Sequence, residues 1–203
     1  MSRILHIDSS ARGEGSHSRQ ISAELVQALT AAHPNTTVTY RDLRAANLPF
    51  VTENWFYGAY TPPADRTDAQ NDALKLSDTL IDELLAADVL VFGIPMYNFS
   101  VPAVFKAYID QIARVGRTFT SSYEGLVKGK KAFVVTARGG GGYGPGEPRE
   151  TVNFEDPYLK SALGFIGITD VTFLHINNTA RGEEVQASLN QVRTQIKEAA
   201  SVS

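Results

Sequence analysis

The chain has 203 residues, of which 43% are hydrophobic and 20% charged, which is typical of a soluble globular protein and predicts a single domain over residues 1–203. The formal net charge is −3 and the basic residues are scattered, which argues against nucleic acid or an anionic membrane as a partner. The absence of cysteine excludes disulfides, thiolate metal sites and iron–sulfur clusters, and the four histidines are too dispersed to suggest a metal centre.

In the first third of the chain, short apolar runs alternate with helical patterns. Residues 3–8 are predicted to form a strand, and apolar residues at helical spacing predict a helix over 18–33 that ends before Pro34. A second strand is expected around 38–40. The stretch 44–66, rich in aromatic residues and prolines, is expected to be irregular.

The same alternation continues to the end of the chain. Thr67 to Gln70 fits a capping box at the start of a helix. The run 89–94 predicts a strand that is buried on both faces. Pro102 suits the first turn of the next helix, which Gly116 closes. The remaining strands are expected at 132–136 and 171–176, and the remaining helices around 158–166 and 185–196.

Five strands that alternate with five helices indicate an α/β fold. We expect a flavodoxin-like three-layer sandwich whose five-stranded parallel sheet has the order 2-1-3-4-5. In such a sheet, ligands bind beyond the carboxyl ends of the strands, at the switch point between strands 1 and 3. The loops after strands 1, 3 and 4 should therefore meet at a binding site.

No feature of the sequence predicts a membrane location. The longest apolar run, 89–96, is too short to span a bilayer. Charged residues at Arg3 and Asp8 leave no room for the core of a signal peptide. A cytoplasmic protein is expected.

The first loop contains Gly13-Glu14-Gly15-Ser16-His17-Ser18, one letter from a dinucleotide-binding fingerprint. In a dinucleotide fold the glycines follow the strand at once, whereas Gly13 lies five residues beyond Asp8. The alternative is that Ser10, Ser16, His17 and Ser18 surround a single phosphate at the helix N-terminus. A plain helix cap by Ser16 or Ser18 is about equally compatible with this loop, and only the number of hydroxyls slightly favours a phosphate.

The other two loops also allow two interpretations. The segment Pro95-Met96-Tyr97-Asn98-Phe99-Ser100-Val101-Pro102 is either a turn with packed aromatic residues or a platform for a flat ring. The segment Ala137-Arg138-Gly139-Gly140-Gly141-Gly142 is either a flexible connection or a set of backbone N–H groups that approach an anion.

Taken together, the motifs PMYNFSVP, SSARGEGSHS, TARGG and GFIGITD resemble the FMN-dependent NADH-azoreductases, also described as NADH:quinone oxidoreductases, of the flavodoxin-like superfamily. The resemblance runs from the first strand to the fifth. It implies a homodimer with one tightly bound, non-covalent FMN per subunit at the interface. It also implies a ping-pong cycle without a catalytic side chain, in which hydride passes from NADH through flavin N5 to quinones, or to aromatic azo bonds that are cleaved to amines.

The resemblance also assigns residues to the FMN site. It places the phosphate at Ser10, Ser16, His17 and Ser18, and the isoalloxazine ring at Met96, Tyr97, Asn98, Phe99, Ala137, Arg138, Gly139 and Gly140. Two departures from the family pattern stand out. Ala137 replaces the usual serine, and Gly141 and Gly142 follow without the histidine that some relatives have there.

Five aromatic residues are candidates for a substrate pocket. Trp55, Phe56, Tyr57 and Tyr60 form either a lid or partner contact, or an aromatic cluster on the domain's own core. Phe165 either reaches the flavin of a partner subunit, by analogy with the family, or packs in the core.

Two other classes of protein remain as alternatives. A flavodoxin-type electron carrier would be strongly acidic around the flavin, which the charge of −3 argues against. An NAD-binding Rossmann dehydrogenase is the weaker alternative and predicts a colourless protein. The preference for NADH over NADPH rests on the family alone. No basic pair for a 2′-phosphate is evident in the sequence, although Arg12, Arg19 or Arg138 could serve.

Overall fold

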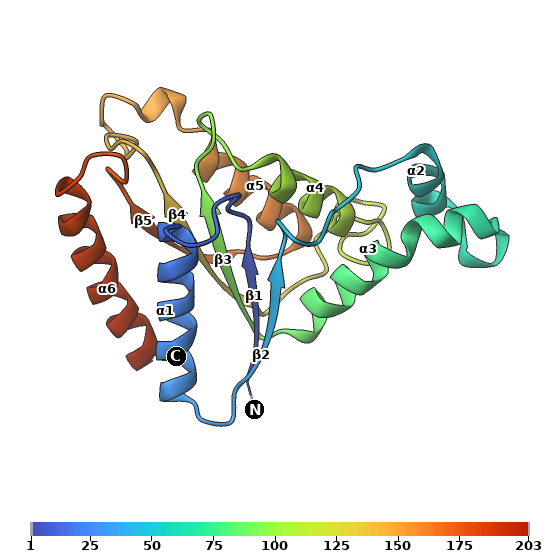
Figure 1. The fold of residues 1–203 in the computed structure, drawn as a ribbon. Helices are drawn as coiled ribbons and strands as arrows, with labels where there is room; N and C mark the ends of the chain where they lie inside the picture. Colours follow the sequence, from blue (N-terminus) through green and yellow to red (C-terminus); the bar gives the residue numbers. More distant parts are fainter. Residues whose placement is uncertain (1, 203) are drawn as a thin grey trace.

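The structure, a computed structural model, describes residues 2–202. Its centre is a five-stranded sheet in the order β2-β1-β3-β4-β5, and every neighbouring pair of strands is parallel (Figure 1). The strands are β1 (Arg3–Asp8), β2 (Thr37–Asp42), β3 (Val89–Pro95), β4 (Lys131–Ala137) and β5 (Asp170–Ile176). The predicted flavodoxin-like topology is confirmed.

Helices cover both faces of the sheet (Figure 1). Helices α1 (His17–Ala32) and α6 (Glu184–Val202) pack on one face, where their apolar side chains form one core cluster with the strands. Helices α3 (Asp68–Ala86), α4 (Ala103–Ile112) and α5 (Glu155–Ile166) contribute to a larger cluster on the other face. The predicted capping box is present, because Thr67 Oγ1 accepts from the Gln70 N–H and Gln70 Oε1 accepts from the Thr67 N–H.

The expectation that residues 44–66 are irregular is wrong, because this stretch contains α2 (Glu53–Tyr60) and a 3₁₀ turn at Pro63–Asp65. The Thr52 side chain caps α2 by accepting from the Trp55 N–H. The Trp55 indole is buried and donates to Gln111 Oε1 at 2.8 Å, which fixes α2 to α4. A helix of eight residues with four aromatics has little intrinsic stability, so this tertiary anchor determines it.

Two smaller differences concern α4. Pro102 is its N-cap residue rather than part of its first turn, and the helix ends at Ile112, before Gly116.

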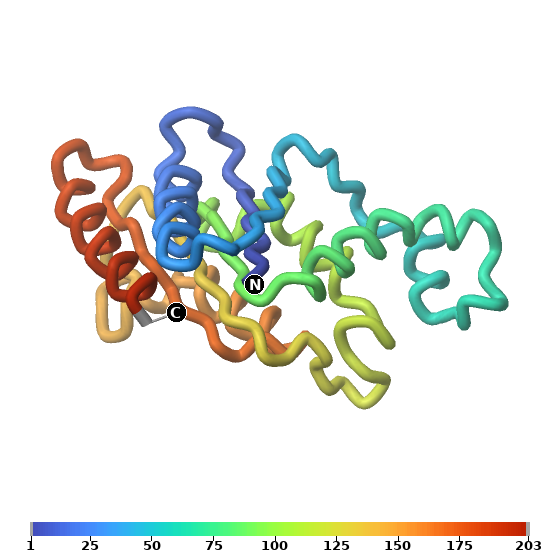
Figure 2. The backbone as a smooth tube through the Cα atoms, turned by 90° about the horizontal axis from the view of Figure 1, so that it is seen from below, coloured from blue at the N-terminus to red at the C-terminus, as the bar shows by residue number. Residues whose placement is uncertain are grey.

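Figures 1 and 2 show that α2 and the start of α3 project away from the sheet and the other helices. Within residues 2–202, no helix combines the length and the apolar character needed to cross a membrane.

Gly93 is the position at which β3 makes room for a buried carboxylate on β1. It lies beside Asp8 in the parallel register. A Cβ at residue 93 would overlap Asp8 Oδ1 and would approach Ser22 Oγ to 3.0 Å. Asp8 is itself buried, so it has no space into which it could move. The absence of a side chain at Gly93 therefore allows the Asp8 carboxylate to lie between the sheet and α1.

Gly93→Ala is expected to lower the free energy of unfolding by about 1–3 kcal/mol, because overpacking at a buried site forces neighbours apart. Urea denaturation followed by circular dichroism measures the change. Gly164→Ala on α5 is the matched control, since a Cβ there meets no atom within 4 Å and alanine favours a helix by up to about 1 kcal/mol. Equal stabilities of the Gly93→Ala variant and the wild type would contradict this account.

Candidate cofactor site

The loops after β1, β3 and β4 meet at the carboxyl end of the sheet, as the strand order predicts. Together they enclose a cavity of about 190 Å³. The residues that line it are Ser10, Arg12, Ser16, His17, Pro95, Met96, Tyr97, Ala137, Gly139 and Thr179. Seven of the predicted cofactor residues are in this set, and the loop after β5 adds Thr179, which the sequence did not indicate.

The N-terminus of α1 opens into this cavity with its hydrogen-bond donors unused. Ser16 is the N-cap residue, but its side chain makes no capping hydrogen bond and lies 3.3 Å from Ser18 Oγ. Helix geometry leaves the N–H groups of the first turn, His17 to Arg19, without an acceptor inside the helix. No other acceptor for them is found in residues 2–202. Neither the Ser16 nor the Ser18 side chain makes a capping hydrogen bond within residues 2–202, so the alternative of a plain helix cap by one of these hydroxyls is wrong.

A buried atom of His17 also lacks a partner. Within the described part of the chain, His17 Nδ1 is shielded from solvent and has no hydrogen bond. Buried polar side-chain atoms are nearly always paired in native proteins. His17, with its unpaired imidazole nitrogen and free N–H, lines one cavity together with Ser10 and Ser16, and the free N–H groups of Ser18 and Arg19 follow in the same helix turn. These residues fit an anionic group such as a phosphate, which the helix dipole also favours.

The loop after β3 is a tight turn with an unusual backbone. The Tyr97 N–H donates to the Ser100 carbonyl at 2.8 Å, and the Ser100 N–H donates back to the Tyr97 carbonyl at 3.2 Å. Between them, Asn98 and Phe99 have φ angles of 48° and 72°, in the left-handed region that costs a non-glycine residue free energy. Such strained conformations concentrate at ligand sites.

Hydrogen bonds tie the turn after β3 to both neighbouring loops. The Tyr97 hydroxyl accepts from the Ala11 N–H at 3.1 Å in the first loop. The Met96 N–H donates to the Ala137 carbonyl at 2.9 Å at the end of β4. The walls of the cavity are therefore fixed relative to one another by hydrogen bonds of the backbone and of the Tyr97 hydroxyl.

In the glycine-rich loop, the Gly139 and Gly140 carbonyls are hydrogen-bonded to the loop after β5, whereas the N–H groups of the same residues have no acceptor in residues 2–202. The Gly139 and Gly140 carbonyls accept from the N–H groups of Ala180 and Asn178, at 3.2 and 3.3 Å. No acceptor is found for the Gly139 and Gly140 N–H groups anywhere in residues 2–202. This arrangement suits backbone donation to the edge of a bound ring, and Ala137, which has no hydroxyl to offer, also lines the cavity.

Arg138 does not line the cavity, although the sequence resemblance placed it in the cofactor site. Its side chain is 1% exposed, and its Nε donates to Glu155 Oε2 at 3.0 Å. Its Nη2 donates to Asp156 Oδ1 at 2.5 Å. The guanidinium therefore anchors the glycine-rich loop to the start of α5. Asn98, Phe99, Gly140 and Ser18 are also absent from the cavity lining, although the buried Ser18 hydroxyl contacts that of Ser16, which does line it.

The aromatic residues proposed for a substrate pocket lie in three different environments, and none lines the cavity. Trp55 is buried against the protein's own α3 and α4. Phe56, Tyr57 and Tyr60 are exposed on α2, with the Phe56 ring 5.2 Å from that of Tyr60. Phe165 is partly exposed, and its ring packs against Phe119 at 4.7 Å.

Comparison with known proteins identifies the class. The flavodoxin-like fold family matches residues 2–200, so the chain belongs to that family. Over 202 residues it is 48% identical to an FMN-dependent NADH:quinone oxidoreductase of Nostoc punctiforme, with 98% of each chain covered. It is 50% identical over 190 residues to a protein of the same name from Nostoc sp., covering 92% of this chain and 91% of that one.

Among solved structures, an azoreductase from Bacillus anthracis str. Sterne superimposes with a TM-score of 0.85 and 28% identity. The match covers 98% of this chain and 100% of that one. Within the flavodoxin-like proteins, the chain thus belongs to the family of FMN-dependent NADH:quinone oxidoreductases and azoreductases. The resemblance inferred from the sequence motifs is confirmed.

The Glu155 carboxyl below the glycine-rich loop should make stability depend on pH. Burial raises the pKa of Glu155 from 4.5 to about 8, against the opposing effect of Arg138. Between these two values the folded state retains a proton that the unfolded state has lost, so the free energy of unfolding falls as pH rises. The contribution is at most about 1.4 kcal/mol per pH unit.

Glu155→Gln is expected to remove this contribution, so the variant gains stability relative to the wild type from about pH 5 to pH 8. Urea denaturation at each pH measures the difference. Glu198→Gln, at an exposed position on α6, serves as the control. A constant difference between wild type and Glu155→Gln across this range would contradict the raised pKa.

Proposed function

We propose that this protein binds FMN without a covalent bond, and that it catalyses two-electron transfer from NADH to quinones and the reductive cleavage of aromatic azo compounds. The observation that carries the proposal is the cavity in which the uncapped N-terminus of α1 meets the turn after β3 and the free glycine N–H groups. Relatives of about 50% identity are named for the quinone activity, and the structural neighbour of 28% identity is named an azoreductase.

Different residues of the cavity would bind the phosphate and the ring of FMN. The N–H groups of His17 to Arg19 and the hydroxyls of Ser10 and Ser16 would hold the phosphate. Met96 and Tyr97 would contact the ring, and the Gly139 and Gly140 N–H groups would donate to its edge. When bound, FMN supplies a ring that accepts a hydride from NADH and passes it on.

The protein contributes position and electrostatics to this reaction. A rigid cavity holds a flat donor or acceptor against the ring at a reactive separation of roughly 3–3.5 Å. Backbone N–H groups of the glycine-rich loop, fixed in direction by their own carbonyl contacts, favour negative charge at the ring edge. No side chain in the cavity lining needs to act as a nucleophile.

We also propose that the protein works as a homodimer. Phe56, Tyr57 and Tyr60 leave an exposed aromatic surface on α2, and Phe165 and Tyr123 leave another beside α5. Exposed aromatic clusters of this kind are typical of protein–protein contacts. Burial of Trp55 keeps α2 attached to the domain, which supports a contact surface there rather than a mobile lid.

Anaerobic addition of NADH to the FMN-loaded protein tests the function. NADH is expected to bleach the flavin absorbance within the mixing time of a manual experiment, and a quinone should restore it. Protein that binds FMN but is not reduced by NADH would be an electron carrier and would contradict the proposal. A protein that is purified without colour and takes up no FMN would favour a dinucleotide-binding dehydrogenase instead.

A further inference from the structure

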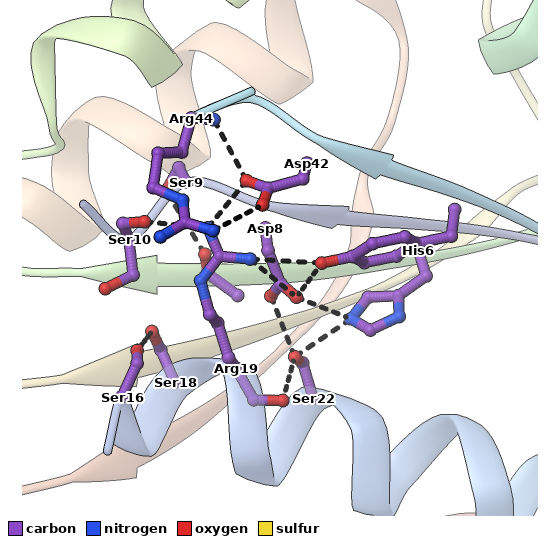
Figure 3. A network of polar contacts seen from close by, with 12 residues as sticks. His6, Asp8, Ser9, Ser10, Ser16, Ser18, Arg19, Ser22, Asp42 and Arg44 are labelled. Carbon is purple, nitrogen blue, oxygen red and sulfur yellow. Dashed lines mark hydrogen bonds and ion pairs between the residues drawn. The ribbon is translucent and has the colours of Figure 1, made fainter. Parts of the chain in front are cut away.

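A network of charged and polar side chains, which runs from the buried Asp8 to the exposed Arg44, joins the end of β1, the start of α1 and the end of β2 (Figure 3). Its members are His6, Asp8, Arg19, Ser22, Tyr40, Asp42 and Arg44. The proposed function uses none of these side chains. Arg19 occupies the centre of the network, because it contacts both carboxylates and also the loop above.

Ser22, His6 and Asp8 superficially resemble a nucleophilic triad. His6 Nε2 and Asp8 Oδ1 each lie 2.9 Å from Ser22 Oγ. However, Ser22 is 0% exposed, so no substrate can reach its hydroxyl. Asp8 also lies 3.4 Å from His6 Nε2, the same nitrogen that faces Ser22, whereas in a triad the carboxylate faces the other ring nitrogen. These residues therefore hold the Asp8 carboxylate in place and do not form an active site.

Arg19 reaches back from the first turn of α1 to the backbone of the first loop. Its Nη2 donates to the Ser10 carbonyl at 2.7 Å, and its Nε donates to the Arg12 carbonyl at 2.9 Å. Arg19 does not line the cavity, whereas Ser10 and Arg12 do. The two carbonyl oxygens are therefore directed away from the cavity. Hydroxyl and N–H groups, rather than carbonyl oxygens, are left to face a bound anion.

The charges around Arg19 have a second effect. Arg19 Nη2 lies 2.6 Å from Asp42 Oδ1, and Nη1 lies 3.7 Å from Asp8 Oδ2. Burial lowers the pKa of Arg19, but the hydrogen bond and charge of Asp42, together with the charge of Asp8, raise it overall. The guanidinium stays protonated, and its single positive charge offsets part of the negative charge of the buried Asp8 and the half-buried Asp42, which would otherwise repel a phosphate.

We propose that Arg19 is a positioning residue for the cofactor phosphate. It holds the backbone of residues 10–12 in the conformation that accepts the phosphate, and its charge offsets part of the negative charge of Asp8 and Asp42, without a side-chain contact to the phosphate itself. This inference rests on the proposed binding of FMN. It predicts that the effect of Arg19 is confined to the phosphate and leaves the ring site unchanged.

The test compares FMN with riboflavin, which has the same ring system but no phosphate. Arg19→Met retains the length of the side chain and removes its charge and donors. Each apoprotein is titrated with flavin, and binding is followed by flavin fluorescence. The FMN affinity of Arg19→Met should be roughly 10- to 100-fold lower than that of the wild type, which is the loss typical when a residue that orients a binding group is removed. Riboflavin binding should change less than about 3-fold, because riboflavin carries no phosphate for the first loop to hold.

Two further variants separate geometry from charge. Arg19→Lys retains the positive charge but cannot span both carbonyls, so its FMN affinity should fall between those of wild type and Arg19→Met. Arg193→Met is the control. Arg193 on α6 makes a comparable bidentate ion pair with Glu24, two turns along α1 from its start, with N–O distances of 2.8 and 2.9 Å. The substitution removes the same charge and should leave both affinities unchanged.

The outcomes distinguish this inference from the function on which it rests. Equal loss of FMN and riboflavin affinity in Arg19→Met would show a merely structural role and would overturn the inference. Unchanged FMN affinity in both Arg19 variants would do the same. If Arg19→Met does not fold, Arg19→Lys alone must show the selective loss of FMN affinity. Wild-type protein that binds FMN no better than riboflavin would overturn the phosphate site itself, and with it the proposed function.

Discussion

The contacts of Arg19 hold the first loop in place against α1 and β2, and the conformation of this loop decides whether it can bind an anion. One guanidinium joins the start of α1, the end of β2 and two carbonyls of the loop between β1 and α1. The buried Asp8 carboxylate is the reason that a cation is needed there, and the missing side chain at Gly93 is the reason that Asp8 fits. The free N–H groups of α1 take their direction from the helix itself, and Arg19 holds the loop of residues 10–12 beside them.

The other walls of the cavity are fixed by backbone hydrogen bonds together with the side chains of Tyr97 and Arg138. Hydrogen bonds join Tyr97 to the first loop and Met96 to the end of β4, and the glycine carbonyls are held by the loop after β5. Arg138 anchors the same loop from below. A site built in this way positions a flat cofactor without mobile side chains, which suits a reaction in which the cofactor ring carries the chemistry.

Local patterns in the sequence predicted most of the fold. The apolar run of β3, the stripe of α6 and the capping box at Thr67 each report on neighbours within a few residues, so they can be read without a structure. Helix α2 was missed because its stability comes from the contact between Trp55 and Gln111, which are 56 positions apart.

The site shows the same division between local and long-range information. The three loops could be located, because topology alone brings the ends of parallel strands together. The burial of Arg138 could not be predicted, since it depends on how α5 packs beneath the loop that precedes it. The contacts of Arg19 with Tyr40 and Asp42 likewise join segments that only the fold brings together. The sequence shows that Arg19 lies in the first turn of a helix after a glycine-containing loop, but it does not show which groups the Arg19 side chain contacts.

The central claim is that the open N-terminus of α1 binds the cofactor phosphate. Amide proton chemical shifts, measured by NMR during titration of the apoprotein with FMN and with riboflavin, test it most directly. The account predicts that the N–H signals of His17, Ser18 and Arg19 move downfield with FMN but not with riboflavin, while those of Gly139 and Gly140 move with both. Signals of Gly13 and Gly15 that move with FMN while those of α1 stay in place would contradict it.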